Sequence, residues 1–176
     1  MATALFISTT DLKKNSIIDG NVDIDKMIQF VKVAQQIDIQ NLLGTDLYNK
    51  ISQDIIDDTL TGNYLTLVNT YVQPCLIWFA QMNYIPFAAY TITNKSVLKH
   101  SSETAQNVDK NEVDYLVSKA REYANYYSTR LVDYLCFNNN LFPEYLSNTN
   151  EDISPDSDTT FKGWVLSLTP LIGLII

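Results

Sequence analysis

Apolar residues recur at helical spacing through the first part of the chain. Between Asp23 and about Asn41 they follow the i, i+3, i+4, i+7 rule, which predicts an amphipathic helix. Gly44 is expected to stop this helix, and Thr45 to cap a second one that runs to the turn at Gly62. The apolar residues that define the two helices are Ile24, Met27, Ile28, Val31 and Ala34 in the first, and Leu47, Tyr48, Ile51, Ile55 and Ile56 in the second.

The third segment, residues 64–92, is apolar on nearly every face. A helix without a polar side is buried, so this segment is expected to lie inside a bundle or against neighbouring subunits. Pro74 and Pro86 are expected to kink or divide it, because each proline removes a hydrogen bond between residues i and i−4.

A fourth helix has the clearest signals at both ends. Asp109 followed by Glu112 is a variant of the capping box and predicts the start of the helix, and three consecutive asparagines from Asn138 predict its end. One face of this helix is apolar along its whole length. The residues of that face are Val113, Leu116, Val117, Ala120, Ala124, Tyr127, Leu131 and Leu135.

These segments predict a mainly α fold, a helical bundle of about four helices. The first twenty residues are expected to be an extended lead-in, and residues 91–107 a loop or short hairpin insertion. Residues 1–140 form the predicted helical body. Residues 141–158 carry five acids and no basic residue, the composition of a flexible acidic linker. Residues 159–176 are expected to form an extended, apolar C-terminal arm.

The stretch FKGWVLSLTPLIGLII, residues 161–176, is apolar and nearly free of charge. A membrane-spanning helix needs about 20 apolar residues, and this shorter stretch is broken by polar residues, a proline and a glycine, so no membrane span is expected. We expect it to bind a neighbouring subunit or another protein partner. The side chains predicted to make this contact are Phe161, Trp164, Val165, Leu166, Leu168, Leu171, Ile172, Leu174, Ile175 and Ile176.

The overall charge limits the kinds of partner. The formal net charge is −8 and the sequence pI is near 4.4, so the chain lacks the basic surface with which proteins grip phosphate backbones. Cys75 and Cys136 both lie in apolar helical surroundings and are expected to be buried free thiols in a reducing compartment. The N-terminus lacks the basic start and long apolar centre of a signal peptide.

Residues suited to catalysis or metal binding are sparse. The chain has one histidine, His100, and contains no G-x-S-x-G, C-x-x-C or H-E-x-x-H motif and no phosphate-binding glycine loop. The acidic pairs Asp57–Asp58 and Glu151–Asp152 offer too few ligands for calcium and are expected to be solvated. We therefore expect no enzymatic activity, no cofactor and no metal site.

Two further features admit more than one interpretation. Lys95, Lys99 and His100 lie together in the polar insertion, where a solvated surface loop is the simpler interpretation and a nucleic-acid contact the alternative. The fourth helix carries more tyrosines than one buried stripe can hold, which predicts a second contact surface besides the core. These tyrosines are Tyr115, Tyr123, Tyr126, Tyr127 and Tyr134.

The stretch AQQIDIQNLLGTDLY, residues 34–48, precedes the buried segment with two prolines, a TNKS loop and the tyrosine-rich last helix. In this combination the chain resembles the small helical head–tail connector proteins encoded beside the portal gene in tailed phages of Bacteroidetes hosts, including crAss-like phages. The most similar members are the ring proteins that lie beneath the portal. The resemblance spans roughly residues 1–140.

The resemblance implies a structural virion protein, made in the host cytoplasm and located at the head–tail junction. Its copies would form a closed ring of about twelve subunits, contacting the portal protein and adjacent neck or tail proteins. Genomic DNA would pass through the ring without sequence-specific binding, and Lys95, Lys99 and His100 would face either this channel or a neighbouring subunit. A stopper or tail-completion protein lower in the neck, and a soluble helical protein-binding module, are the alternatives.

Overall fold

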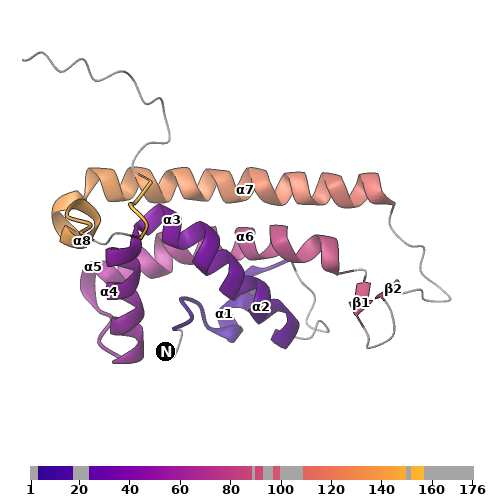
Figure 1. Cartoon of the computed structure of the whole chain (residues 1–176), viewed down its shortest axis with the longest axis horizontal. Helices are drawn as coiled ribbons and strands as arrows, with labels where there is room; N and C mark the ends of the chain where they lie inside the picture. Colours follow the sequence, from indigo (N-terminus) through magenta and orange to yellow (C-terminus); the bar gives the residue numbers. More distant parts are fainter. Residues whose placement is uncertain are drawn as a thin grey trace, which may run out of the picture.

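Helix α6 (Gln73–Tyr84) lies at the centre of the protein body, with α2 (Ile24–Ala34) and α7 (Lys110–Phe137) packed against it (Figure 1). The mainly α fold predicted from the sequence, with four long helical segments and a short hairpin, is confirmed. No helix in the described part of the chain is both long enough and apolar enough to cross a membrane. The computed structural model describes residues 4–17, 24–88, 90–92, 97–99, 109–149 and 152–156.

The first two predicted helices meet at Gly44. α2 continues through a π-helical turn, η1 (Gln35–Ile39), and α3 (Gln40–Leu43), and α4 (Thr45–Ile56) follows directly. Gly44 has a φ of +74°, a backbone conformation that glycine adopts without the steric penalty of a Cβ atom. The predicted helix stop at Gly44 is therefore confirmed.

The third predicted segment stays helical through Pro74, with a π-helical turn just before the proline. α5 (Gly62–Leu67) passes into a second π-helical turn, η2 (Val68–Val72), immediately before α6. In this turn the Gln73 amide donates to the Val68 carbonyl five residues earlier. Pro74 then falls in the first turn of α6, directly after this π-helical turn.

Pro86 ends the same segment. It lies in the 3-10 turn η3 (Ile85–Phe87), after which come the strands β1 (Tyr90–Ile92) and β2 (Val97–Lys99). The two strands pair in an antiparallel arrangement, so the short hairpin predicted in this insertion is present.

α7 begins at the predicted capping box. The backbone amide of Asp109 donates to the Glu112 carboxylate at 3.0 Å, and the Asp109 side chain accepts hydrogen bonds from amides of the first turn. The helix ends before Asn138, as predicted. Its buried residues are Ala120, Ala124, Leu131, Val132 and Leu135.

The N-terminal segment differs from the extended lead-in that its sequence predicts. Ser8 caps a short helix, α1 (Thr9–Asn15), because its hydroxyl accepts a hydrogen bond from the Asp11 amide at 3.0 Å. Just before the cap, Phe6 and Ile7 are buried in the core. The segment is therefore an integral part of the body.

Three glutamine side chains hold this N-terminal segment to the helices. Gln35 is fully buried and accepts from the Phe6 amide at 3.0 Å, and the Gln73 side chain donates to the Phe6 carbonyl at 3.0 Å. Gln81 accepts from the Ile17 amide at 2.9 Å. Buried backbone groups need partners, and the glutamine amides supply them here.

The first part of the predicted acidic linker, residues 141–158, differs from a solvated tether. After α7 come the 3-10 turn η4 (Asn139–Leu141) and α8 (Pro143–Leu146). Phe142 and Tyr145 are buried in the core, at 0% and 5% exposure. Because these two apolar side chains, spaced three residues apart, share one face of a helical turn, the chain folds back onto the body here.

Residues 152–156 also lie against the body, at the corner between α3 and α4. The Thr45 amide donates to the Ile153 carbonyl at 2.9 Å, and the Asp156 amide donates to the Asn41 carbonyl at 2.9 Å. Thr45, predicted as the cap of α4, is instead the first residue of that helix. The sequence predicted a flexible linker from its polar composition, but polar groups of this segment form hydrogen bonds to the body. Residues 157–158 lie outside the described part.

The two cysteines differ in their environment. Cys75 is buried in α6, as predicted. Cys136 is exposed on α7, contrary to the prediction, because it follows Leu135 of the buried face and so points to one side of that face.

Candidate protein-interaction surfaces

The two predicted contact regions lie mostly outside the described residues. All ten residues predicted for the apolar arm, from Phe161 to Ile176, fall beyond Asp156, and Lys95 and His100 fall in parts of the insertion that are not described. Lys99 ends strand β2, where it pairs with Tyr90. The roles of these residues stay predictions, and the described residues present other surfaces.

Aromatic side chains gather along the line where η2 and α6 meet α7. The rings of Tyr71 and Tyr134 stack with their centroids 3.9 Å apart and their planes at 15°. The centroids of Trp78 and Tyr123 lie 4.5 Å apart. We call this band the aromatic seam, and it consists of Tyr71, Trp78, Tyr123, Tyr126, Tyr127 and Tyr134.

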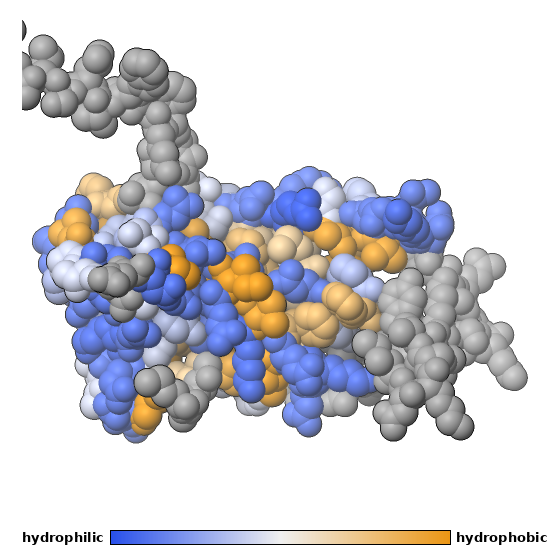
Figure 2. All heavy atoms as spheres, in the orientation of Figure 1, coloured by the Kyte–Doolittle hydropathy of each residue, from blue (hydrophilic) through white to orange (hydrophobic). Residues whose placement is uncertain are grey.

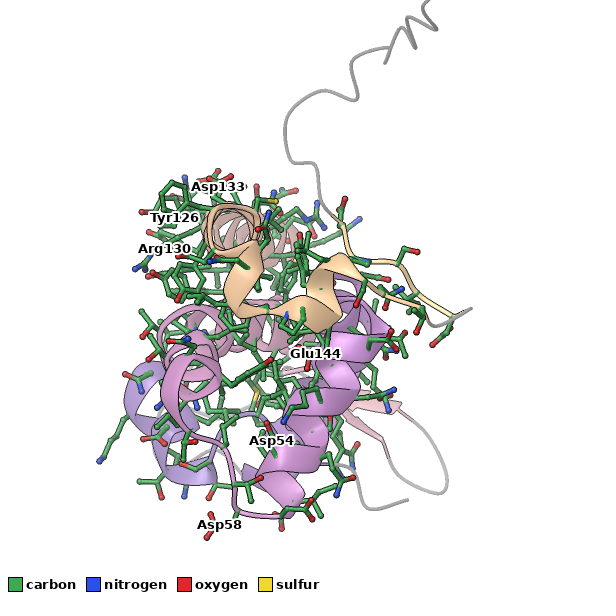
Figure 3. All side chains as sticks on the ribbon, turned by 90° about the vertical axis from the view of Figure 1, so that its left-hand side faces the viewer. Asp54, Asp58, Tyr126, Arg130, Asp133 and Glu144 are labelled. Atoms are coloured by element: carbon green, nitrogen blue, oxygen red, sulfur yellow. The ribbon has the colours of Figure 1, made fainter. Side chains whose placement is uncertain are left out.

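Much of the aromatic seam is open to solvent. Tyr126 is 64% exposed and Tyr123 is 49% exposed. The Arg130 guanidinium lies 4.9 Å from the centre of the Tyr71 ring, a cation–π geometry. Figure 3 shows Tyr126 and Arg130 on the side of α7 that is turned away from Asp54 and Glu144. Burial and the neighbouring Tyr71 raise the pKa of Tyr134, so its hydroxyl stays neutral.

Small residues in the packed face of α7 explain why these rings lie at its edge. Ala120 and Ala124 are buried, as is Ala80 on α6, and their small side chains allow the two helices to approach closely. Tyr123 projects to one side of the alanines and Tyr126 points away from them, so neither ring lies at the centre of the helix contact.

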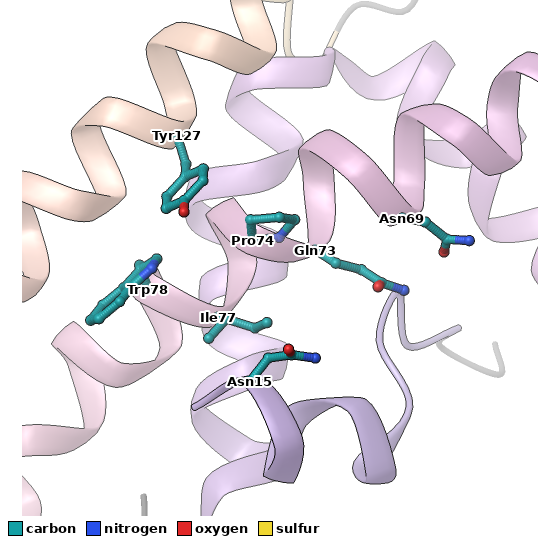
Figure 4. Close-up of a pocket in the computed structure, with 7 residues that line it drawn as sticks. All are labelled: Asn15, Asn69, Gln73, Pro74, Ile77, Trp78 and Tyr127. Carbon is teal, nitrogen blue, oxygen red and sulfur yellow. The ribbon is translucent and has the colours of Figure 1, made fainter. Parts of the chain in front are cut away.

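A hollow of about 340 Å³ opens beside the aromatic seam, between α1, η2, α6 and α7 (Figure 4). Trp78 and Tyr127 come from adjoining helices and form apolar walls, and amide side chains lie around them. We call this feature the α1–α6–α7 hollow. The residues that line it are Asn15, Asn69, Gln73, Pro74, Ile77, Trp78 and Tyr127, none of which is charged.

A second apolar surface lies on α2. Ile37 is 59% exposed, and Val33, one turn earlier on the same side, is also exposed. The Phe30 ring extends this surface toward Phe87, with the two centroids 5.5 Å apart. Figure 2 shows apolar side chains gathered over the middle of α2. We call this the α2 face, and it consists of Phe30, Val33, Ile37 and Phe87.

The two surfaces lie on opposite faces of the body. α2 crosses the front of the body in Figure 1, whereas Tyr126 and Arg130 project to the far side, as the turned view in Figure 3 shows. α6 separates them, because α2 and α7 both pack against this helix. One copy of the chain therefore exposes aromatic side chains on one face and aliphatic side chains on the other.

Asp38 in η1 and Cys75 in α6 are titratable groups whose charged forms are disfavoured by burial. Asp38 Oδ2 is buried without a hydrogen-bond partner. Burial raises the pKa of Asp38 to about 6, and the Asn83 side chain lowers it in part. Burial, and secondarily the Asp38 charge, raises the pKa of the Cys75 thiol. A thiol that stays protonated is a poor nucleophile.

The acids near the end of α4 are engaged in local contacts. Lys50 Nζ lies 2.5 Å from Asp54, and the Tyr64 hydroxyl donates to Glu144 at 2.7 Å, near the acids labelled in Figure 3. Burial and this hydrogen bond raise the pKa of Tyr64. Across the described ranges, no group of three or more histidine, cysteine, aspartate or glutamate side chains is placed to hold a metal ion.

Sequence reasoning anticipated only part of these surfaces. The excess of tyrosines on α7 predicted that several would lie outside the core, and Tyr115, Tyr123 and Tyr126 do. It did not indicate Trp78 or the α1–α6–α7 hollow, because one wall of the hollow comes from α1, where an extended segment was expected.

The protein is thus a mainly α-helical one with exposed aromatic and apolar side chains. Residues 39–154 match the family described as "Family of unknown function (DUF6712)", and this range covers more than half of the 176-residue chain. The chain belongs to this family. The matched range includes residues 152–154 at the α3–α4 corner. No curated protein and no solved structure matches the chain.

Proposed function

We propose that the chain is a structural subunit of a ring at the head–tail junction of a tailed phage, beneath the portal. The observation that supports this most is the placement of the aromatic seam and the α2 face on opposite sides of the body. In a ring, one surface of each subunit contacts a different surface of its neighbour, so two distinct surfaces are required. The resemblance over residues 1–140 supports the same proposal.

The composition of the aromatic seam suits a contact between proteins. Tyrosine, tryptophan and arginine are enriched at protein interfaces, because a large apolar body can be buried while a polar tip keeps a hydrogen bond. Trp78, Tyr126 and Arg130 have this character. The rings are also rigid side chains, so little conformational entropy is lost when they are covered.

Charge and the C-terminal residues complete the proposal. With a net charge of −8, a ring of these subunits repels DNA in its channel, which lets the duplex slide without adhering. The apolar residues from Phe161 to Ile176 bind a neighbouring subunit, the portal or the next neck protein. Burying about half of their large side chains yields on the order of 10 kcal/mol before the entropy of ordering is subtracted.

The assembly state of the purified full chain tests the proposal. Native mass spectrometry and end-on electron microscopy, with and without the portal protein, are expected to show closed rings that match the portal's symmetry. One-to-one binding to a partner would favour a protein-binding module instead. A protein that stays monomeric at high concentration, with and without portal, would contradict the proposal.

Two variants test the pairing of the surfaces. Tyr126→Glu places a charge on the aromatic seam and Ile37→Glu one on the α2 face, and both positions are exposed, so folding should be retained. Each variant alone should fail to form rings, and an equimolar mixture should form a dimer through the one intact pair of surfaces. Ser118→Glu, exposed on α7 outside the seam, is the matched control and should still form rings.

A further inference from the structure

We infer that the α1–α6–α7 hollow of one copy receives Trp164 from the C-terminal residues of a neighbouring copy. This inference rests on the proposed ring function and names the site at which the terminal residues bind. The hollow lies beside the aromatic seam, in the surface that a neighbour would cover, and it has space for one or two aromatic side chains.

The chemistry of the hollow fits an aromatic anchor on an extended peptide. Trp78 and Tyr127 provide ring faces and edges against which an indole packs favourably. The amide side chains of Asn15 and Asn69 lie at the margin of the hollow and supply donors and acceptors for peptide groups on both sides of the anchor.

The low charge of residues 161–176 makes them a better occupant of the hollow than other segments of the chain. The side chains that line the hollow are uncharged. Residues 161–176 contain two aromatic side chains, Phe161 and Trp164, and a single charged one, Lys162. An apolar segment with so little charge enters an uncharged hollow without the desolvation penalty of burying ionised groups.

The position of Asp156 favours a neighbouring copy over the same copy. The Asp156 amide is bound to the Asn41 carbonyl at the α3–α4 corner, so the path to Trp164 starts from this corner. Eight residues separate Asp156 from Trp164 and reach at most about 28 Å when fully extended. In Figure 3, α4 beside this corner and α1, which forms one wall of the hollow, lie on opposite sides of the body, so the chain's own hollow does not face the corner.

Photo-crosslinking in the full chain tests the inference. A benzophenone amino acid replaces Trp164, and light and isotopically heavy copies are mixed before irradiation. Mass spectrometry is expected to find position 164 joined to residues 69–78 or 123–127 in light–heavy pairs. Crosslinks confined to single copies would show binding to the chain's own hollow, and crosslinks to other residues would show a different site. Either result, like an absence of crosslinks, would overturn the inference.

A pair of hollow variants provides the matched comparison. Asn69→Trp fills the hollow from an exposed position and is expected to reduce the crosslink yield about tenfold. Thr70→Trp adds the same side chain at the next exposed position, which does not line the hollow, and should leave the yield unchanged. Equal yields in the two variants would contradict the inference.

The outcome separates this inference from the proposed function. Crosslinks into the hollow of a neighbour, found in an assembly that end-on images show to be an open filament, would retain the inference and reject the ring. Rings that form without these crosslinks would retain the ring and reject the inference.

Discussion

A Cβ atom on Gly44 would lie 2.7 Å from Cδ of Pro155 and 2.9 Å from its backbone nitrogen. Cβ atoms essentially never come this close to other heavy atoms, so the two residues fit together only because position 44 has no side chain. Gly44 also has a positive φ. The α3–α4 corner and residues 152–156 are thus fitted around one glycine.

Gly44→Ala is expected to lower the free energy of unfolding by about 2–3 kcal/mol, because alanine adds steric contact to backbone strain. Gly62→Ala is the matched control. Gly62 has a φ of +58° with nothing within 4 Å of an added Cβ, so only the strain of about 1 kcal/mol applies. Urea unfolding followed by circular dichroism measures both, and equal losses would show that contact with Pro155 has no effect.

Gln35→Leu is expected to lower the free energy of unfolding by about 2–4 kcal/mol. The change keeps the side-chain size but leaves the Phe6 amide and the Ala4 carbonyl buried without their partner. Gln36→Leu, at the next, exposed position, is the control and should change stability by less than about 0.5 kcal/mol. Hydrogen exchange should show faster exchange of the Phe6 amide in the first variant alone, and unchanged exchange would contradict the role of Gln35.

Asp38→Asn is expected to raise the free energy of unfolding at neutral pH. The pKa of Asp38 is about 6 in the folded protein against an ordinary 3.8, so between these values the folded state binds more protons than the unfolded state. Stability attributable to Asp38 therefore falls as pH rises through this window. Solvent screening of the partly buried carboxyl limits the gain in the variant to about 1 kcal/mol.

The pH dependence of urea unfolding checks this prediction. The difference between Asp38→Asn and the original protein should be near zero at pH 4 and reach its full size at pH 7.5. Asp114→Asn, which changes an exposed carboxylate on α7, provides the comparison. A gain that is the same at both pH values would rule out ionisation of Asp38 as the cause.

Asp58→Gly is expected to be about 1 kcal/mol more stable than Asp58→Ala. Asp58 has a φ of +55° just beyond α4, and the Thr59 amide donates to the Asp54 carbonyl at 2.8 Å, which is the arrangement of a Schellman motif. Both variants remove the same charge, so their difference isolates the backbone conformation. Thermal unfolding of the two proteins measures it, and equal stabilities would contradict the assignment.

The elements that were predicted correctly from the sequence depend on interactions between residues only a few positions apart. The capping box of α7 and the turn at Gly44 involve residues within one helical turn, so a short stretch of sequence is enough to recognise them. In the amphipathic pattern, Gln35 would be assigned to the polar side of the helix. It is buried instead, because its side chain bonds to the backbone of Phe6, 29 residues earlier in the chain. Polar residues that bond to distant backbone carry no local signal of burial.

The exposed surfaces likewise include one feature that the sequence indicates and one that depends on residues far apart in the chain. An excess of tyrosines on α7 is countable in the sequence, and it correctly indicated rings outside the core. The α1–α6–α7 hollow depends on how Asn15, Trp78 and Tyr127 meet in space, which no spacing along the chain specifies. The linker prediction for residues 141–158 was wrong over 152–156 because composition does not reveal that Asn41 and Thr45 offer hydrogen-bond partners there.

The docking of residues 152–156 also determines when the corner at Gly44 can form during synthesis of the chain. The Thr45 hydroxyl meets its acceptor on Asp152 across a sequence separation of 107 residues. Pairings of such range slow folding, and synthesis delivers the N-terminal partner first. The corner at Gly44 thus stays incomplete until residues 152–156 have been synthesised, long after α4 itself.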